Sequence, residues 1–184
     1  MQIIQTPLEG LVEIVPTLFL DERGWFYESF KKERFHQAGI SYDFVQENQS
    51  FSRKGVVRGL HFQREPFAQA KLASVLYGRV LDVVLDIRPG SPTFGHVYSC
   101  ILDSEKRNML MVPEGFAHGF SALEDSIFFY KCSQTYNKEA EGGILWNDPT
   151  LKIDWKVENP VVSPKDQQLP TFEEFLRKSV ISRA

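Results

Sequence analysis

A histidine and an arginine lie three residues apart in an otherwise apolar segment, and together they could move a proton beside a bound anion. The segment is VVRGLHFQ, residues 56–63, in which Gly59 stands between Arg58 and His61. Residues three apart on a strand point to opposite faces unless the alternation breaks, and a glycine permits such a bulge. His61 would then be a base and Arg58 an anion clamp. Spacing alone favours the plainer alternative, a core histidine with an internal hydrogen bond and a surface arginine.

A second histidine, His118, follows a tight turn in PEGFAHGF, residues 113–120. This stretch resembles the second motif of cupin barrels, whose metal-binding members add a His-x-His pair, because a divalent ion needs several imidazole and carboxylate ligands. In this chain the position two residues after His61 is Gln63. The two other histidines fall in a predicted helix and beside a Pro/Gly turn. We therefore expect no metal.

Two tyrosines and two charged strand residues complete the set of candidate functional residues. Tyr130 and Tyr136 share one face of a regular strand but stand about 20 Å apart at ~3.3 Å per residue, so both serve one atom only if the strand bends. The alternative is two core aromatics with satisfied hydroxyls. Lys71 and Asp82 lie in strand-like segments, where a charge on a buried face needs a partner, although each alone is typical of a rim residue. From strand parity we expect Asp82 behind one of the histidines.

Length and composition are those of one ordinary globular domain, residues 1–184. The chain is 42% hydrophobic and 24% charged, which excludes a disordered or fibrous protein. No stretch approaches the ~20 apolar residues that span a bilayer, and the first residues lack a basic segment followed by an apolar one. We expect a cytoplasmic protein without a membrane partner.

The net charge and the cysteine content limit which ligands and which cysteine-based sites are expected. A net charge of −3 argues against nucleic-acid binding, which depends on a basic surface, but permits one anionic ligand. Cys100 and Cys132 are too few and too far apart for a disulfide scaffold or a Cys-x-x-Cys site, so we expect both to be reduced.

The elements that must position these residues are mostly strands. Residues 81–88 alternate, with Leu81, Val83, Leu85 and Ile87 on one face, and aromatics at 13% favour β structure. Further strands are expected at residues 12–20, 25–30, 44–50, 56–63, 71–77, 97–102, 108–112 and 127–136. Helices are expected at 31–38 and after Thr171, whose spacing to Glu174 is that of a capping box. Many short strands with few helices predict an antiparallel sandwich or barrel.

Together these segments resemble the dTDP-4-dehydrorhamnose 3,5-epimerase family, the cupin-type sugar-nucleotide epimerases. The matching stretches are residues 21–30 (DERGWFYESF), 44–63, 91–95 (SPTFG), 113–120, 130–131 and 146–149 (WNDP). The chain departs from the family at Glu47, where Asp is usual, and at residues 66–70 (PFAQA) before Lys71. The resemblance implies a mainly β, cupin-type jelly-roll barrel with a few short peripheral helices, without a cofactor or metal.

The resemblance also implies roles for individual residues. The family removes protons from sugar carbons 3 and 5, which are acidic only through the ketone at carbon 4. His61 matches the catalytic base, Asp166 its partner, Lys71 the cation beside the keto oxygen and Tyr130 the acid on the opposite face. Matched to substrate binding are Arg23, Phe26, Glu28, Gln46, Glu47, Asn48, Arg58, His118, Tyr136, Glu141 and Lys165. A homodimer is implied, in which the N-terminal strands of one subunit complete the pocket of its neighbour.

Other functions remain open from the sequence. A mono-epimerase would use the same base and acid at one carbon, and Glu47 leaves room for a different nucleotide sugar. From other classes, a metal-dependent cupin oxygenase would bind iron, and a silent sugar-binding cupin would lack the base and acid. The presence of His61, Lys71, Tyr130 and Asp166 argues against the silent form.

Overall fold

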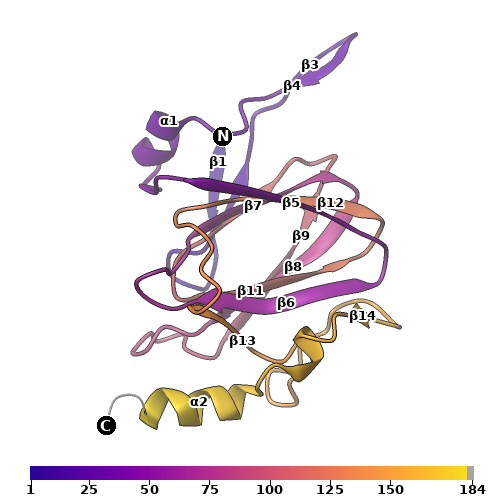
Figure 1. Ribbon diagram of the computed structural model, residues 1–184. Coiled ribbons are helices and arrows are strands. Elements are labelled where there is room, and N and C mark those ends of the chain that lie inside the picture. Colours follow the sequence, from indigo (N-terminus) through magenta and orange to yellow (C-terminus); the bar gives the residue numbers. More distant parts are fainter. Residues whose placement is uncertain (182–184) are drawn as a thin grey trace.

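The protein consists of two sheets packed face to face, as the computed structural model of residues 1–181 shows (Figure 1). The first sheet has the order β1 (Gln2–Gln5), β2 (Val12–Val15), β10 (Met109–Val112), β7 (Lys71–Tyr77), β12 (Ser126–Cys132) and β5 (Gln46–Ser52). The second has the order β13 (Glu141–Gly143), β6 (Val56–Gln63), β11 (Phe116–Ala122), β8 (Arg79–Asp86) and β9 (Val97–Asp103). These neighbours are antiparallel, whereas β14 (Val161–Val162) pairs in parallel with β6. The expected mainly β jelly-roll fold is confirmed.

The remaining elements lie outside the two sheets. They are the ribbon of β3 (Phe19–Asp21) and β4 (Gly24–Phe26), helix α1 (Lys32–Gln37), the 3-10 turn η1 (Asp166–Gln168) and helix α2 (Phe172–Ile181). Figure 1 shows the ribbon projecting away from the body, α1 beside the first sheet and α2 beneath the second. The helices are peripheral, as expected. Among residues 1–181 no helix is long and apolar enough to cross a membrane.

The main core fills the space between the sheets at one end of the barrel. It is formed by Ala73, Val75, Val80, Val84, Leu102, Leu110, Val112, Phe116, Phe120 and Phe128, together with Leu8 and Leu11. Phe120 from the second sheet stacks on Phe128 from the first, with ring centroids 4.2 Å apart. This stacked pair separates the apolar end of the barrel from the polar side chains of the cavity described below.

The second sheet is covered on both faces, which explains the burial of β8. Leu81, Val83, Leu85 and Ile87 share the predicted face and pack under the C-terminal segment. The other face of β8 joins the core between the sheets. At the C-terminal end, Thr171 and Glu174 exchange backbone-to-side-chain hydrogen bonds of 2.8 and 3.2 Å, which confirms the capping box before α2.

Some strand predictions were wrong in extent. The predicted strand 12–20 ends at Val15, before Pro16, and resumes as β3; the strand 127–136 ends at Cys132. Strands β1, β11, β13 and β14 were not predicted. All seven residues of β11 are buried, so the strand lacks the polar alternation by which a half-exposed strand is recognised.

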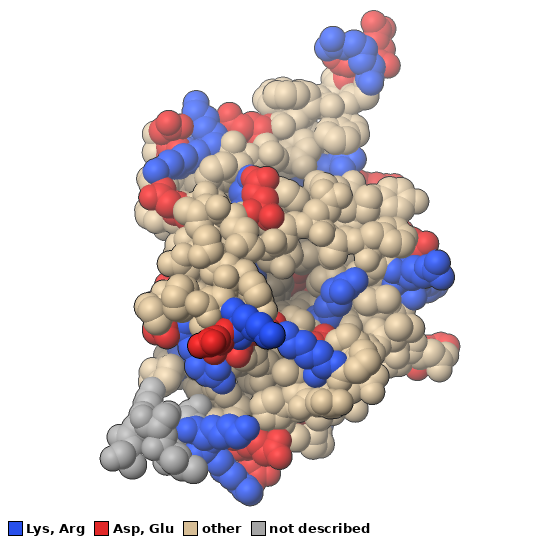
Figure 2. Space-filling model, in the orientation of Figure 1, with Lys and Arg blue, Asp and Glu red and all other residues tan. Residues whose placement is uncertain are grey.

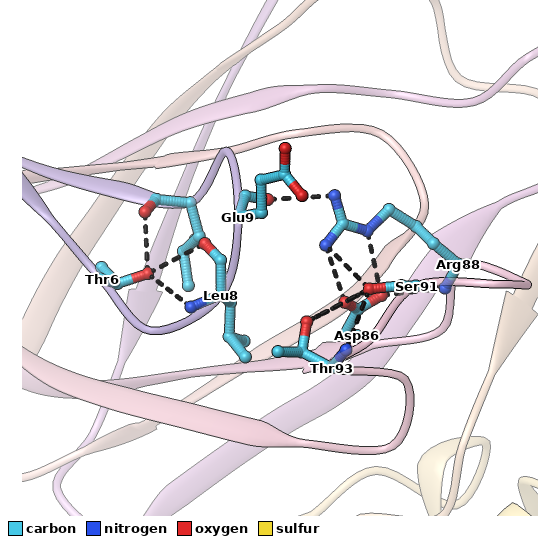
Figure 3. A network of polar contacts seen from close by, with 8 residues as sticks. Thr6, Leu8, Glu9, Asp86, Arg88, Ser91 and Thr93 are labelled. Atoms are coloured by element: carbon cyan, nitrogen blue, oxygen red, sulfur yellow. Dashed lines mark hydrogen bonds and ion pairs between the residues drawn. The ribbon is translucent and has the colours of Figure 1, made fainter.

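A buried ion pair joins the end of β8 to the N-terminal segment (Figure 3). Asp86, fully buried, accepts from the Arg88 guanidinium at 2.7 Å and from the hydroxyls of Ser91 and Thr93 at 2.7 Å each. Arg88 donates in turn to the backbone oxygen of Glu9 at 3.0 Å. Burial alone would raise the pKa of Asp86, but the hydrogen bonds from Arg88, Ser91 and Thr93 bring it well below its usual value. The SPTFG stretch is therefore structural.

Candidate active site

A bulge in β6 brings Arg58 and His61 into one cavity. Gly59 has φ +127°, and the register between β6 and β11 shifts opposite it, between His118 and Phe120. A Cβ atom on Gly59 would lie 2.6 Å from the Cα of Gly119. Strands β6 and β11 can therefore approach this closely only because both residues are glycine. The predicted break in alternation is confirmed.

The cavity has a volume of about 660 Å³ and lies between the two sheets. Figure 2 shows a hollow on this face with basic side chains at its border. It is lined by Asn48, Gln49, Ser50, Val56, Val57, Arg58, His61, Lys71, His118, Gly119, Phe120, Phe128, Tyr130, Val161, Val162, Ser163, Pro164, Lys165 and Asp166. All four residues matched to the family's catalytic positions are among them.

His61 and Asp166 form a dyad on the wall made by the second sheet. His61 Nε2 lies 2.7 Å from Asp166 Oδ1, and the Gly59 backbone N–H donates to Asp166 Oδ2 at 3.2 Å. Burial alone would raise the pKa of Asp166, but the hydrogen bond and charge of His61 and the bonds from Gly59 and Ser163 lower it. Asp166 is therefore a carboxylate, which only accepts hydrogen bonds, so Nε2 carries the proton and Nδ1 is the basic nitrogen.

Tyr130 faces the same cavity from the first sheet. It is the direct cross-strand neighbour of Asn48 on β5 and packs against Phe128, with ring centroids 5.9 Å apart. Burial raises the pKa of the Tyr130 phenol, and the Cys132 thiol adds to the shift, while Asn48 and Arg58 oppose it. The phenol therefore holds its proton at neutral pH. The imidazole of His61 and the phenol of Tyr130 thus line one cavity from different sheets.

Lys71 lines the same cavity beside Tyr130. Its Nζ lies 5.7 Å from the centroid of the Tyr130 ring. Burial lowers the pKa of Lys71, and the negative charges of Cys132, Asp82 and Glu141 oppose that shift. No described carboxylate lies within ion-pair distance of Lys71, so its Nζ is available to a ligand oxygen.

His118 forms a second histidine-carboxylate pair beside the first. Its Nε2 lies 2.7 Å from Asp82 Oδ1, with His118 6% exposed and Asp82 0% exposed. His118 is paired in register with His61 across β11 and β6. The expectation from strand parity that Asp82 lies behind a histidine is thus met.

A chain of polar contacts surrounds the mouth of the cavity. Lys165 donates to Glu141 Oε2 at 2.6 Å, and the Tyr136 hydroxyl donates to the same oxygen at 2.9 Å. These bonds lower the pKa of Glu141 against the effect of burial and raise that of Lys165. Gln46 accepts from the Tyr136 backbone N–H at 2.8 Å and donates to Asn48 Oδ1 at 3.0 Å. Because the strand ends at Cys132, Tyr136 lies at the mouth while Tyr130 lies inside.

Arg58 stands at the other side of the mouth. Its Nε donates to Ser52 Oγ at 3.0 Å and its Nη2 to the Phe51 backbone oxygen at 3.2 Å. These bonds fix the guanidinium while leaving other N–H donors for a ligand. With Lys165, Arg58 gives the mouth two cations.

Seven residues matched to substrate binding are not among those that line this cavity: Gln46, Tyr136 and Glu141, which belong to the contacts around its mouth, and Arg23, Phe26, Glu28 and Glu47. Arg23, Phe26 and Glu28 belong to the ribbon and the segment after it, where Phe26 is 68% exposed and Arg23 pairs with Asp21 at 2.5 Å. Glu47 points to the opposite face of the first sheet and forms an ion pair with Lys131. The departure at Glu47 therefore changes the outer face of the sheet and not the wall of this cavity.

The residue that replaces the second histidine of a metal-binding cupin has a structural role. Gln63 donates to the backbone oxygens of Phe67 and Thr135 at 2.6 and 3.2 Å and accepts from the Asn137 N–H at 2.7 Å. Within residues 1–181 no group of three or more His, Cys, Asp or Glu side chains is placed to hold a metal ion.

The C-terminal segment supplies cavity residues that the sequence analysis did not identify. Val161, Val162, Ser163 and Pro164 line the cavity, and Ser163 Oγ accepts from the Asp166 backbone N–H at 3.1 Å. The signal for this segment is weak: two valines before a Ser-Pro turn pair with β6 over two residues. Phe120 and Phe128, which form the floor, were likewise not identified.

Comparison with known proteins identifies one family that the chain resembles over most of its length. The model of the family described as dTDP-4-dehydrorhamnose 3,5-epimerase matches residues 5–174. A dTDP-4-dehydrorhamnose 3,5-epimerase of Shigella flexneri is 48% identical over 168 residues, covering 90% of this chain and 93% of the relative.

Solved structures give the same result. The dTDP-4-dehydrorhamnose 3,5-epimerase of Elizabethkingia anophelis superposes with a TM-score of 0.91 at 47% identity, covering 95% of this chain and 97% of the other. The dTDP-6-deoxy-D-glucose 3,5-epimerase of Legionella pneumophila, solved in complex with dTDP-4-keto-L-rhamnose, gives 0.89 at 46% identity, covering 94% and 93%.

Proposed function

Because the chain belongs to the dTDP-4-dehydrorhamnose 3,5-epimerase family, we propose that His61 and Tyr130 perform its two inversions from opposite walls of the cavity. The chain epimerises carbons 3 and 5 of dTDP-4-dehydro-6-deoxy-D-glucose and forms dTDP-4-dehydro-L-rhamnose. A base that returns its proton to the same side regenerates the substrate, so inversion needs one group on each side of the sugar. The position of His61 on β6 and Tyr130 on β12, in facing sheets, is the observation that carries this proposal.

Proton removal begins at His61. With Nε2–H donated to Asp166, the free Nδ1 takes the proton from carbon 3 or 5, which the neighbouring ketone makes acidic. Asp166 stabilises the imidazolium that forms and holds the ring in orientation. General-base help of this kind contributes ~10² to 10⁴-fold.

The negative charge that leaves the carbon collects on the keto oxygen. Lys71, with its ammonium in the cavity and no described carboxylate within ion-pair distance, stabilises this oxygen as the charge grows. Tyr130 then donates its phenolic proton to the carbon from the side opposite His61, and proton exchange with solvent restores the free imidazole and the phenol before the second inversion. The raised pKa of Tyr130 keeps its phenolic proton available until the enolate forms.

The nucleotide occupies the mouth of the cavity. Arg58 and Lys165 meet the diphosphate, since paired charge-assisted hydrogen bonds suit a guanidinium and a phosphate. Gln46, Asn48, Glu141 and Tyr136 surround the nucleoside end, and His118 contacts the sugar. Two cations at one mouth bind a single anionic ligand without a basic surface, consistent with the net charge of −3.

The functional form is a homodimer in the cytoplasm. Phe19, Leu20, Trp25 and Phe26 of the ribbon are between 53% and 75% exposed, which is an apolar surface that a second copy would cover. In the dimer the ribbon of one subunit brings Arg23, Phe26 and Glu28 to the cavity of the other. Phe26 then offers a stacking surface for the thymine base. Nucleic acid and membranes are not partners.

Deuterium incorporation from D2O tests this function. The dTDP-linked 4-keto sugar is incubated with tag-free protein, and deuterium at each carbon is counted by proton NMR. We expect deuterium at carbons 3 and 5 and the L-rhamno product. Label at one carbon only would identify a mono-epimerase, and no label with stoichiometric bound iron would favour the oxygenase.

A further inference from the structure

Asp82 is a fully buried carboxylate that contacts the cavity residue His118, and the steps above give it no role. It lies on β8, on the same face as Val80 and Val84 of the core between the sheets. Its Oδ1 lies 2.7 Å from His118 Nε2. Its Oδ2 has no hydrogen-bond partner, and among the described side chains, those of residues 1–178, it is the only buried nitrogen or oxygen without one.

An arrangement of this kind stabilises a fold poorly. A buried carboxylate with an unpaired oxygen loses its hydration and needs an opposite charge close by. Among the described residues, the imidazole of His118 is the basic group within ion-pair distance of Asp82, while Lys71 lies farther away but close enough for the two charges to interact. An apolar residue of similar size would pack at this position at least as well, so packing does not explain the aspartate and a functional role does.

Asp82 also decides which nitrogen of His118 faces the substrate. A carboxylate only accepts hydrogen bonds, so Nε2 carries a proton and points toward the interior of the barrel. Nδ1 has no hydrogen-bond partner in the described chain, and it is not among the buried unpartnered atoms. Since His118 lines the cavity, Nδ1 faces the space that the sugar occupies.

We propose that Asp82 is a positioning residue that keeps His118 protonated and turns its Nδ1–H toward the sugar oxygen that gains charge beside Lys71. The proposal rests on the function proposed above. Lys71, His118 and Asp82 then carry one net positive charge, which matches the single negative charge of an enolate. A fixed donor aimed at that oxygen stabilises the transition state more than the ground state.

The first test measures the ring of His118 without any substrate. Protein labelled with ¹⁵N-histidine is examined by NMR at pH 7, as wild type and as Asp82→Asn, with His118→Asn identifying the signals. In the wild type we expect both ring nitrogens of His118 to be protonated. In Asp82→Asn, which keeps the shape but removes the charge, we expect the neutral ring.

The second test is kinetic. Asp82→Asn should lower kcat about 10²-fold, the cost typical of losing one donor to a developing oxyanion, with a change in KM below about threefold. Val80→Ala, on the same strand and face and equally buried, is the matched control and should lower stability without changing kcat. In a His118→Asn background, Asp82→Asn should add no further loss, because it acts through the ring.

Two outcomes would overturn the proposal. One is a neutral His118 in wild-type protein at pH 7, a result that stands even if Asp82→Asn does not fold. The other is a folded Asp82→Asn with wild-type kcat. Failure of the wild type to exchange deuterium would instead refute the proposed function, and the NMR measurement would still report on the pair.

Discussion

Gly59 and Gly119 pack backbone against backbone at the point where β6 and β11 change register, and neither position has room for a side chain. A Cβ on Gly119 would lie 2.5 Å from the Arg58 backbone oxygen, and one on Gly59 would lie 2.6 Å from the Gly119 Cα. The shift that follows places Arg58 and His61 in one cavity although they are three residues apart. The close packing of the two strand backbones therefore helps to place Arg58 and His61 in one cavity.

Substitution of Gly119 by alanine should separate these two groups. The added methyl overpacks the contact between Gly59 and Gly119, so we expect a loss of about 2 kcal/mol in the free energy of unfolding and a fall in kcat/KM of more than about tenfold. Gly39→Ala is the control: its φ of +83° makes alanine costly, by about 1 kcal/mol, but nothing lies within 4 Å. Wild-type kcat/KM in Gly119→Ala, at any stability, would show that this contact does not position the site.

Removal of the base should abolish all chemistry. His61→Ala leaves no group to take the carbon-bound proton, so we expect turnover and deuterium wash-in at both carbons to fall by at least ~10³-fold. His36→Ala, on the exposed face of α1, serves as the control with unchanged rates. Full activity in His61→Ala would remove the proposed base.

Removal of the acid should have a different signature. Tyr130→Phe keeps the ring and its packing on Phe128 but has no proton to give. His61 can still remove and return a proton on its own side, so we expect deuterium wash-in from D2O to continue while inversion falls about 10²-fold or more. An equal loss of deuterium wash-in and of inversion would mean that Tyr130 does not act as the acid from the opposite face.

The sequence predicted the cavity well where local pattern and family resemblance agreed. The break at Gly59 followed from strand alternation alone, whereas the pairing of His61 with Asp166, 105 positions later, came only from the resemblance. No local pattern marks Asp166, since it stands on a short 3-10 turn that parallel pairing of β14 brings beside β6. Contacts between such distant segments depend on topology.

Two features were missed from the sequence, for different reasons. Strand β11 is buried on both faces, so it has no alternation, although it carries His118. Glu47 lies between Gln46 and Asn48 in a strand, so alternation alone places its side chain on the other face, where it meets Lys131. The position of the Glu47 side chain was missed because Gln46, Glu47 and Asn48 were treated as one binding unit.

The ion pair between Asp86 and Arg88 should give a measurable pH dependence of stability. The folded-state pKa of Asp86 lies below its usual value, so its contribution is fully present above the unfolded pKa of ~3.9 and is lost as the pH falls toward the folded-state value. Asp86→Asn should therefore lose about 3 kcal/mol at pH 7, and the difference from wild type should shrink below about pH 4.

Chemical denaturation at fixed protein concentration, repeated from pH 7 to pH 3, measures this difference. Glu173→Gln, which removes an exposed pair with Arg177, is the control and should change stability little at any pH. A difference between wild type and Asp86→Asn that stays constant over this range would contradict the assigned charge of Asp86.

Mixing two inactive variants tests whether the ribbon serves the neighbouring subunit. Arg23→Ala should impair the cavity that its ribbon enters, and His61→Ala impairs its own. If Arg23 acts across the dimer, a mixed dimer holds one cavity with both residues intact, and random exchange of subunits should restore about a quarter of wild-type activity. If Arg23 served its own subunit, every cavity in the mixture would lack one residue and activity would stay at the level of the separate variants.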